Sequence, residues 1–427
     1  MTKAEIMELI EQEDVKFIRL QFSDIFGSLK NLAVTPGQMD KVFANKYSFE
    51  GSAMFSGYYD SDIKLYLYPD INTFSILPWR PQQGKVAKII CDVCYEDGRP
   101  YEISSRCILK RVIEDAKKKG YTFMVDPECE FFLFHTDENG MPTTTTHELA
   151  GYMDVGPTDF GENARRNIVL MLEEMGFEIE SSHHEHAPAQ HEIDFKEEEA
   201  LKMADSIQTF RFAVRSIAKR FGLYATFMPK PKNGCAGSSM HINISMLKDG
   251  KNLFRSEDNS ITKEADYFMG GILKHAKALC AISNPVVNSY KRLASGFEAP
   301  GVISWATKGE KALVKLNAGL DDTKVELRFP DSASNPYLLI ATCIAAGLDG
   351  IENKYSAGNE YDSSVNKYED LPDNIKEAVD KLNEDDVIKN VLGKEFTEVY
   401  SIIKRNAWAE YMTEVSDWEL NRYLIKM

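Results

Sequence analysis

Carboxylates stand in pairs on two predicted strands of the sequence. Within 126–134, Glu128 and Glu130 lie two residues apart in an apolar and aromatic run, so their side chains project from the same face of a strand. Between 180 and 195, a polar strand, a proline-containing turn and a second strand would return Glu192 close to Glu185. Neighbouring acids in such strands are costly unless a cation lies between them. The spacing therefore indicates a metal site.

Two more strands carry single groups that could join this site. Glycine and serine lead into 240–246, where His241 stands on an alternating strand, and Glu326 shares one strand face with Arg328. Taken alone, a strand histidine is more often a satisfied structural residue, and an inward Glu-x-Arg is often a buried ion pair. The four histidines between 183 and 191 could suggest zinc. Because carboxylates dominate the whole set, Mg²⁺ or Mn²⁺ fits better.

Several common nucleotide and hydrolase motifs are absent from the sequence. It contains no G-x-x-x-x-G-K-[ST] phosphate loop, no G-x-G-x-x-G turn, no G-x-S-x-G elbow and no H-E-x-x-H helix. A bound nucleotide would therefore depend on metal ions and arginines to hold its phosphates, rather than on a glycine-rich loop.

The composition fits a globular protein that acts on small molecules. The chain has 427 residues and a formal net charge of -16, which argues against a nucleic-acid partner because such binding needs clustered Lys and Arg. Its longest apolar stretch, 337–348, is too short to span a bilayer, and its start lacks the apolar core of a signal peptide. The odd number of cysteines favours a reducing, cytoplasmic compartment. Cys91-x-x-Cys94 resembles a redox or zinc half-site, but its place in an alternating strand favours a structural role.

The predicted elements divide the chain into two domains, 1–103 and 104–427. A leading helix and short alternating strands predict a small, mainly β first domain. Strand-like runs among long helical patterns predict an α+β second domain, with an antiparallel or mixed sheet covered by helices. The expected strands of this domain are 122–135, 177–186, 191–195, 240–246 and 324–329, and its main expected helices are 106–119, 161–175, 197–221, 261–283 and 335–353.

Motifs in this order and spacing resemble those of type I glutamine synthetases over nearly the whole chain. They are DPECEFFLF (126–134), GYMDVGPTD (151–159), HHEHAPAQHEIDF (183–195), FMPKP (227–231), NSYKRL (288–293) and GFEAPG (296–301). The resemblance implies a small N-terminal β-grasp domain and a large catalytic domain, whose mainly antiparallel sheet forms a funnel covered by helices. It also implies active sites between neighbouring subunits, in a dodecamer of two hexameric rings.

The same resemblance implies a reaction and a set of site residues. Glutamate would be joined to ammonia or an amine with ATP, through an acyl phosphate, at a site with two or more Mg²⁺ or Mn²⁺ ions. One ion would bind Glu130, Glu185 and Glu192, and the other Glu128, His241 and Glu326. The implied catalytic residues are Glu298, Arg328 and Glu50, and the implied substrate contacts are Arg292, Gly237, Tyr152, Glu298 and Arg328. The nucleotide would contact Glu180, Asn243, Ser245, Lys315 and Lys324.

The chain departs from the family pattern mainly around the substrates. Glu50-Gly51-Ser52-Ala53 stands where the family has Asp-Gly-Ser-Ser, and Ala236 replaces an asparagine. Lys315 and Lys324 stand in place of nucleotide-binding arginines, which keeps the charge but removes the bidentate fork. Glu310 replaces another of these arginines and reverses the sign of the charge.

These departures leave three interpretations open. The first is glutamine synthetase proper, which the full set of metal-binding positions supports. The second is a γ-glutamyl-amine or related carboxylate-amine ligase, which the changes at Glu50, Ala53 and Ala236 favour. The third is a catalytically weak, ring-forming homologue, which Glu310 motivates.

Overall fold

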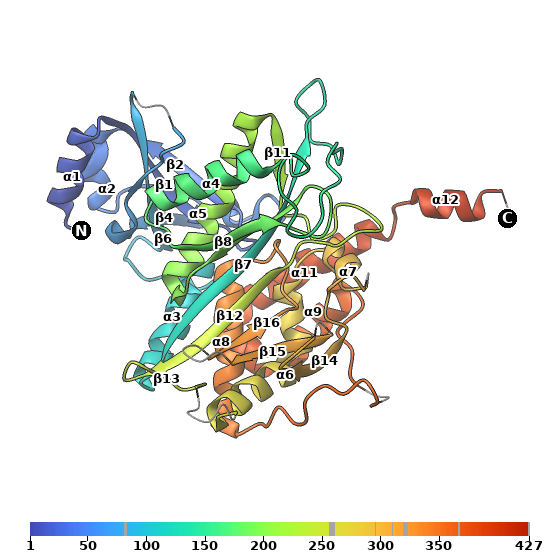
Figure 1. The fold of residues 1–427 in the computed structure, drawn as a ribbon. Coiled ribbons are helices and arrows are strands. Elements are labelled where there is room, and N and C mark those ends of the chain that lie inside the picture. Colours follow the sequence, from blue (N-terminus) through green and yellow to red (C-terminus); the bar gives the residue numbers. More distant parts are fainter. Residues whose placement is uncertain are drawn as a thin grey trace.

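The chain folds into a small N-terminal domain beside a larger domain that carries a long, twisted sheet (Figure 1). This computed structural model describes residues 1–80, 83–255, 261–294, 296–309, 311–318, 323–365 and 368–425. The expected fold class, a β-grasp domain followed by an α+β catalytic domain, is confirmed. The boundary at 103/104 stays a prediction, and it falls two residues before the first helix of the large domain.

The small domain is one mixed sheet with helices at its edge. Its described elements are α1 (Lys3–Gln12), β1 (Val15–Ser23), β2 (Leu29–Val34), α2 (Met39–Phe43), β3 (Ser48–Glu50), β4 (Lys64–Pro69), β5 (Ser75–Ile76) and β6 (Lys85–Cys94). The strand order is β2-β1-β6-β4-β3, with β5 also paired to β6, and β1 and β6 run parallel. A capping box formed by Thr2 and Glu5 begins α1. Cys91 and Cys94 are buried free thiols in β6, as the structural interpretation of this motif requires.

The large domain is built on a mainly antiparallel sheet. Its described strands are β7 (Thr122–His135), β8 (Ile179–His184), β9 (Gln190–Phe195), β10 (Glu198–Glu199), β11 (Leu223–Thr226), β12 (Met240–Lys248), β13 (Lys251–Asn252), β14 (Val302–Ala306), β15 (Ala312–Ala318) and β16 (Thr323–Leu327). The main order is β14-β15-β16-β12-β7-β9-β8, while β10 and β11 pair with β7 and β13 pairs with β12. Within the described residues, β14 and β15 are the one parallel pair of this sheet.

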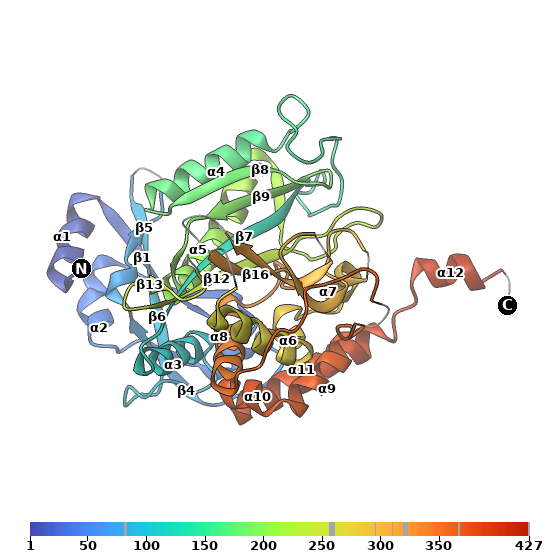
Figure 2. The ribbon, with the colours of Figure 1, turned by 60° about the horizontal axis from the view of Figure 1, so that its bottom comes forward.

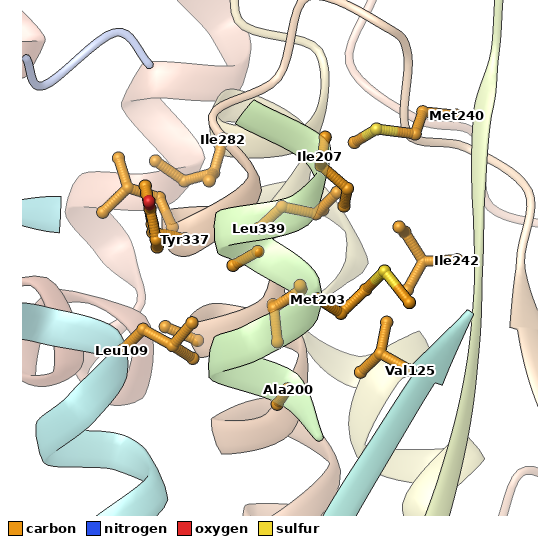
Figure 3. Packing of buried hydrophobic residues seen from close by; sticks show 14 of the residues in the cluster. Leu109, Val125, Ala200, Met203, Ile207, Met240, Ile242, Ile282, Tyr337 and Leu339 are labelled. Carbon is orange, nitrogen blue, oxygen red and sulfur yellow. The ribbon is translucent and has the colours of Figure 1, made fainter. Parts of the chain in front are cut away.

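Helices cover one side of this sheet. They are α3 (Ser105–Lys118), α4 (Glu162–Glu174), α5 (Ala200–Ala218), α6 (Lys263–Ser283), α7 (Val287–Leu293), α8 (Pro336–Asn353), α9 (Ile375–Glu384), α10 (Asp386–Leu392) and α11 (Lys394–Tyr411). Figure 3 shows Met203 and Ile207 of α5 packed toward Val125 and Ile242 of the sheet. The tight crossing of α6 and α8 depends on Gly271, because a Cβ there would lie 2.1 Å from a main-chain oxygen of α8.

A buried ionic network joins the two domains. Arg106 of α3 contacts Asp70, Asp92 and Asp205 at 2.8, 2.5 and 2.9 Å. The hydroxyl of Tyr337 donates to Asp205 at 2.7 Å. Because Asp70 and Asp92 belong to the small domain and Asp205 to α5, this arginine fixes how the two domains sit against each other.

The chain ends in a helix that leaves the body of the protein. α12 (Asp417–Tyr423) projects beyond α11 in both ribbon views (Figures 1 and 2). Large apolar side chains in and after it are exposed, among them Trp418, Leu424 and Ile425. Within the described part of the chain, no helix is both long and apolar enough to cross a membrane.

Candidate active site

Strands β7, β8, β9, β12 and β16 contribute to the wall of one cavity of about 590 Å³. Eight of its described lining residues are carboxylates, namely Asp126, Glu128, Glu130, Glu180, Glu185, Glu192, Asp194 and Glu298. Its described lining residues with a permanent positive charge are Arg292, Lys324 and Arg328. Such an excess of acids creates a strongly negative potential, which attracts cations and repels anionic substrates.

Strand register brings Glu128, His241 and Glu326 together. His241 of β12 lies opposite Glu128 of β7, and Asn243, two residues further along, lies opposite Glu326 of β16. The His241 Nδ1 atom is 2.9 Å from Glu128 and 3.7 Å from Glu326. Glu326 also accepts hydrogen bonds from Arg328 at 2.6 Å and from Asn317 at 2.8 Å. The three residues can offer one ligand atom each, and these atoms all lie within 4.8 Å of one another.

Glu185 and Glu192 form a second group around His183. The hairpin of β8 and β9 returns the chain, so that His183 Nε2 lies 2.9 Å from Glu185 and 3.5 Å from Glu192. Glu130 stands directly opposite Glu192 in the register of β7 and β9. It accepts hydrogen bonds from Gln190 at 2.7 Å and from the main-chain N–H of Ser239 at 2.9 Å.

Burial and mutual repulsion oppose the ionisation of Glu130 and Glu192 in this cavity. Burial raises the pKa of Glu130 to about 7, and the charge of Glu185 adds to this effect. Burial, followed by the charge of Glu130, raises the pKa of Glu192 well above its usual range. Burial opposes the ionisation of Glu128 as well, but the hydrogen bond and charge of His241 outweigh it and hold the pKa at about 2.

The residues present fit divalent cations. The Nε2 atom of His241 is buried and has no hydrogen-bond partner among the described residues. It lies beside carboxylates whose mutual repulsion disfavours the ionised state, and a cation removes that repulsion. Because oxygen atoms dominate the set, a hard ion such as Mg²⁺ or Mn²⁺ suits it.

Arg292 and Gly237 shape the floor of the cavity. Arg292 is buried, and its guanidinium donates to the main-chain oxygens of Phe329 at 3.0 Å and of Arg328 at 3.1 Å. A Cβ at Gly237 would lie 2.2 Å from the main-chain oxygen of Pro229, so no larger residue fits. Both residues line the cavity together with the carboxylate groups.

Tyr152, His186 and Glu298 lie together at the mouth of the cavity. The rings of Tyr152 and His186 stack with centroids 4.5 Å apart and an interplanar angle of 3°. His186 Nε2 contacts Glu298 at 2.9 Å, and both side chains are more than two-fifths exposed. Glu298 adopts a positive φ of 50°, a conformation that costs a residue other than glycine energy.

Of the positions expected at the nucleotide, Glu180, Asn243 and Lys324 line the cavity, whereas Lys315 and Ser245 are not among its described lining residues. Lys324 contacts Asp126 at 2.9 Å, and Lys315 contacts Glu326 at 3.4 Å. Ser245 donates to Glu197 at 3.4 Å, whereas Glu180 lines the cavity. Glu310 lies outside the described residues.

Glu50 does not join this cavity within one chain. It is exposed at the end of β3 in the small domain, and it is not among the described residues that line the cavity. Ala236 is buried in a small apolar cluster with Phe132 and Phe134, next to Gly237. An asparagine at 236 would therefore meet aromatic side chains unless this segment moved.

A second buried group of acids and histidines lies behind the hairpin of β8 and β9, and the sequence analysis did not predict it. It consists of Glu148, Asp159, His184 and His191, all of them buried. Arg165 enters the group and donates to Asp159 at 2.7 Å and to His191 Nδ1 at 2.8 Å. The opposite ring nitrogen of His191 packs against Gly161, where a Cβ would lie 2.3 Å away. The guanidinium thus occupies the place that a metal ion would need.

The fold and the cavity are those of an enzyme that acts on small molecules and offers carboxylate and imidazole groups able to hold a metal ion. Residues 14–96 match the family model "Glutamine synthetase, beta-Grasp domain", and residues 102–423 match "Glutamine synthetase, catalytic domain". Glutamine synthetase of Clostridium saccharobutylicum is 50% identical over 100% of this chain and 99% of its own. Glutamine synthetase of Methanosarcina mazei is 44% identical over 99% and 98% of the two chains.

A solved structure described as "GmaS/ADP complex-Conformation 1" is similar with a TM-score of 0.90 and 31% identity, and the match covers 98% of this chain and 99% of that chain. A second, "Apo GmaS without ligand", has a TM-score of 0.88 and 30% identity. The chain belongs to the glutamine synthetase family, and it is a ligase.

Proposed function

We propose that this chain joins ammonia to the side-chain carboxylate of glutamate with ATP, and so forms glutamine. The observation that carries the proposal is the meeting of two carboxylate groups with Arg292 and Arg328 in one cavity. Full-length relatives at 43–50% identity carry the name glutamine synthetase, which supports the same activity.

The acidic groups have distinct parts in this proposal. Glu130, Glu185 and Glu192 hold one Mg²⁺ or Mn²⁺ ion, and Glu128, His241 and Glu326 hold a second. Such ions, when bound, neutralise carboxylate and phosphate oxygens that would otherwise be repelled by the cavity. His183 belongs beside the first group, because it already contacts two of its carboxylates.

The permanent cations position the reacting groups. Arg292 binds the carboxylate of glutamate that does not react, and Arg328 neutralises charge as the reacting carboxylate attacks the γ-phosphorus of ATP. The oxygen–phosphorus bond to ADP breaks, which leaves an acyl phosphate and ADP. Lys315, Lys324, Asn243, Ser245 and Glu180 would contact the nucleotide, and Lys324, Asn243 and Glu180 line the cavity, which supports their part of this assignment.

Ammonia, the source of the amide nitrogen, binds at the mouth of the cavity. Tyr152 lines the pocket for ammonium, and Glu298 accepts a proton when ammonia attacks the acyl carbon and phosphate leaves. The His186–Glu298 contact holds this carboxylate across the opening, where it also hinders the entry of water.

The complete enzyme is proposed to be a dodecamer of two hexameric rings in the cytoplasm. A neighbouring subunit would then bring the Glu50 segment to the cavity, which explains why that residue lies far from it within one chain. The exposed apolar side chains around α12 support contact with another copy, since such groups are normally covered. The free thiols of all seven cysteines support a reducing compartment.

The second candidate is an amine ligase of the same mechanism. The changes from the family pattern at Glu50, Ala53 and Ala236 favour it, as does the likeness to the GmaS structures. We keep it below the first candidate because the relatives named glutamine synthetase are much more similar in sequence. The weak homologue that Glu310 motivates is a third possibility within the same proposal.

One assay tests these alternatives. ADP release is measured with glutamate and either ammonia, methylamine, ethanolamine or a polyamine as the acceptor. A higher kcat/KM for ammonia supports glutamine synthesis, and a higher value for an amine supports the second candidate. Failure with every acceptor overturns both.

A further inference from the structure

A second cavity, of about 550 Å³, lies between the two domains on the other side of β12. β1, the turn after it and β2 form one wall, and α5 with the segment after β11 forms the other. Three arginines line it, Arg19 from β1 and Arg211 and Arg215 from α5. No carboxylate occurs among its described lining residues. Its electrostatic character is therefore opposite to that of the catalytic cavity.

Arg211 is the least explained of these cations. Only 7% of its surface is exposed, and it forms no ion pair with a described carboxylate. The polar contact recorded for its guanidinium among the described residues is a weak one, to the sulfur of Met240 at 3.5 Å. A buried charge with so poor a partner is costly, and natural structures normally satisfy it.

The second arginine of α5 increases this cost. Arg211 and Arg215 stand four residues apart, so they lie on the same face of the helix. Both guanidiniums lie over the ring of Phe227, at 5.8 and 5.1 Å from its centroid. Arg215 is in the last turn of α5, where the helix dipole favours a cation, whereas Arg211 lies one turn further in.

Asp331 and Asp24 form no ion pair with Arg211 or Arg215, although the charge of Asp331 acts on Arg211 from a distance. Asp331, just before the lining residue Ser332, accepts from Asn284 at 3.1 Å and from the main-chain N–H of Ala333 at 2.9 Å. Asp24, before the lining turn, accepts from two main-chain N–H groups at 2.8 and 2.9 Å. Both carboxylates thus accept hydrogen bonds that hold their own loops.

We infer that this cavity binds a phosphate group, either inorganic phosphate or the phosphoryl end of an organic phosphate ester. Guanidinium forks match phosphate oxygens in geometry and charge, and a dianion compensates Arg211 and Arg215 together. Arg19 approaches from the opposite domain, where Asn31 accepts from it at 3.2 Å. Apolar lining residues such as Phe26, Met228 and Leu29 leave room for an organic body beside the phosphate.

The site is placed to influence catalysis from behind the sheet. Met240, the sulfur partner of Arg211, directly precedes His241 on β12. Ser332, which lines the cavity, has its hydroxyl 2.6 Å from the main-chain oxygens of both Glu130 and Ser239. A bound anion also draws Arg19 of the small domain toward α5. Occupancy therefore couples the domain interface to the strands that carry the acidic groups.

The test uses the full-length, Mg²⁺-loaded protein in phosphate-free buffer at constant ionic strength. Inorganic phosphate, glycerol 3-phosphate, succinate and chloride are compared by thermal unfolding and by titration calorimetry. We expect both phosphates to raise the Tm and Arg211→Gln to weaken their binding about tenfold or more. Arg220→Gln, an exposed arginine beyond the end of α5, is the matched control and leaves binding unchanged.

Two substitutions separate this site from the catalytic cavity, where phosphate is also a product. Phosphate binding supports the proposal only if it is lost in Arg211→Gln and retained in Arg220→Gln. If Arg211→Gln does not fold, Arg215→Gln at the exposed rim replaces it, with an expected loss of about fivefold. Tighter binding of glycerol 3-phosphate than of phosphate identifies an ester as the ligand, and equal binding identifies free phosphate.

Three results would overturn the inference. Phosphate binding that is equal in the wild type and Arg211→Gln assigns all of it to the catalytic cavity. Succinate binding that depends on Arg211, without phosphate binding, assigns the site to carboxylates. Absence of any anion effect shows that the arginines are neutralised within the assembled protein.

Discussion

Two buried groups of acids and histidines lie back to back on the β8–β9 hairpin, and they balance their charge in different ways. The group of Glu148, Asp159, His184 and His191 contains its own cation, Arg165. The catalytic group around Glu130, Glu185 and Glu192 has no such permanent cation in contact with its carboxylates among the described residues. The same residue types thus build a closed ionic network in one place and a candidate cation site in the other.

The difference shows what separates a metal site from a structural network. In the closed group Arg165 donates to Asp159 and to one ring nitrogen of His191, and Gly161 packs on the other ring nitrogen. In the acidic cavity, burial and mutual repulsion instead hold the pKa values of Glu130 and Glu192 high, and the Nε2 atom of the neighbouring His241 has no described partner. An excess of buried negative charge beside open space is the informative feature, rather than the number of possible ligands.

The largest effect is expected from breaking the catalytic group. Glu192→Gln removes one proposed metal ligand, and we expect ATP-dependent amide formation to fall by about 1000-fold or more. Without divalent cations, the same variant should be at least as stable as the wild type, because it removes repulsion with Glu130. Steady-state assays and thermal unfolding in the presence of a chelator measure the two effects.

Glu138→Gln, an exposed acid on a loop, is the matched control. It should change neither quantity. Near-normal turnover of Glu192→Gln, or a large loss of its cation-free stability, would show that this carboxylate belongs to a closed network instead.

The next effect is expected from the closed group, with the opposite pattern. Arg165→Met leaves Asp159 buried without its cation, so we expect a loss of about 3–5 kcal/mol in unfolding free energy. The loss should be the same with and without Mg²⁺, because this group binds no ion. Thermal or urea unfolding under both conditions provides the measurement. Arg166→Met changes the exposed neighbour on the same helix and should cost less than about 0.5 kcal/mol.

The acidic residues of the cavity could be predicted from the sequence, but the closed group of Glu148, Asp159, His184 and His191 could not. Residue spacing on apolar strands identified Glu128 and Glu130 as neighbours, and the structure places them on β7 with His241 across the ladder. It gave no sign of Glu148 or Asp159, since both lie in loops without periodicity. Hydrogen-bond partners such as Gln190 and Ser239 depend on strand register, which spacing alone does not determine.

Helices and strands with strong local sequence patterns were also predicted, whereas those that depend on distant contacts were not. The helices expected at 261–283 and 335–353 are observed at Lys263–Ser283 and Pro336–Asn353, because their apolar periodicity and caps are strong. Strands β14 and β15 were not predicted, because their short runs lie among glycines, lysines and the segments around 310 and 319–322. The small sheet was expected as β structure, but its parallel β1–β6 pair depends on contacts far apart in the chain.

A third buried ionic group lies among the helices, and its cation is a histidine whose charge depends on pH. His275 lies between Asp385 at 2.6 Å and Asp349 at 2.9 Å. Burial lowers its pKa, but the hydrogen bonds and charges of the two aspartates outweigh burial and raise the pKa above the usual 6.5. The imidazole is therefore the cation of a closed group, as Arg165 is, but it can lose its proton.

The sign of the pH dependence follows from the raised pKa. The stabilisation by His275 is fully present below pH 6.5 and is lost as the pH rises through the folded-state pKa. We expect His275→Gln to cost roughly 1–3 kcal/mol at pH 6 and clearly less at pH 9. Unfolding of both proteins across this range measures the difference. The exposed variant His147→Gln should show no such trend, and a constant cost for His275→Gln would mean that the imidazole is neutral throughout.

The smallest effect is expected at the mouth of the cavity, where charges are paired but exposed. Contact with His186 holds Glu298 in a backbone conformation that is unfavourable without support. His186→Ala should lower kcat/KM for ammonia by about three- to tenfold, because an exposed pair contributes little. It should also raise the ratio of phosphate released to glutamine formed, since water then reaches the acyl phosphate more easily.

That ratio distinguishes a positioning role from a general weakening of the site. A loss of rate with unchanged coupling would mean that His186 only supports the local fold. His147→Ala, an exposed histidine whose ring contacts His135 instead, is the matched control and should change neither rate nor coupling. If His186→Ala alone raises the ratio of phosphate released to glutamine formed, His186 helps to exclude water from the acyl phosphate. Its neighbour Glu185 is a proposed metal ligand, so the two roles would then fall on adjacent residues.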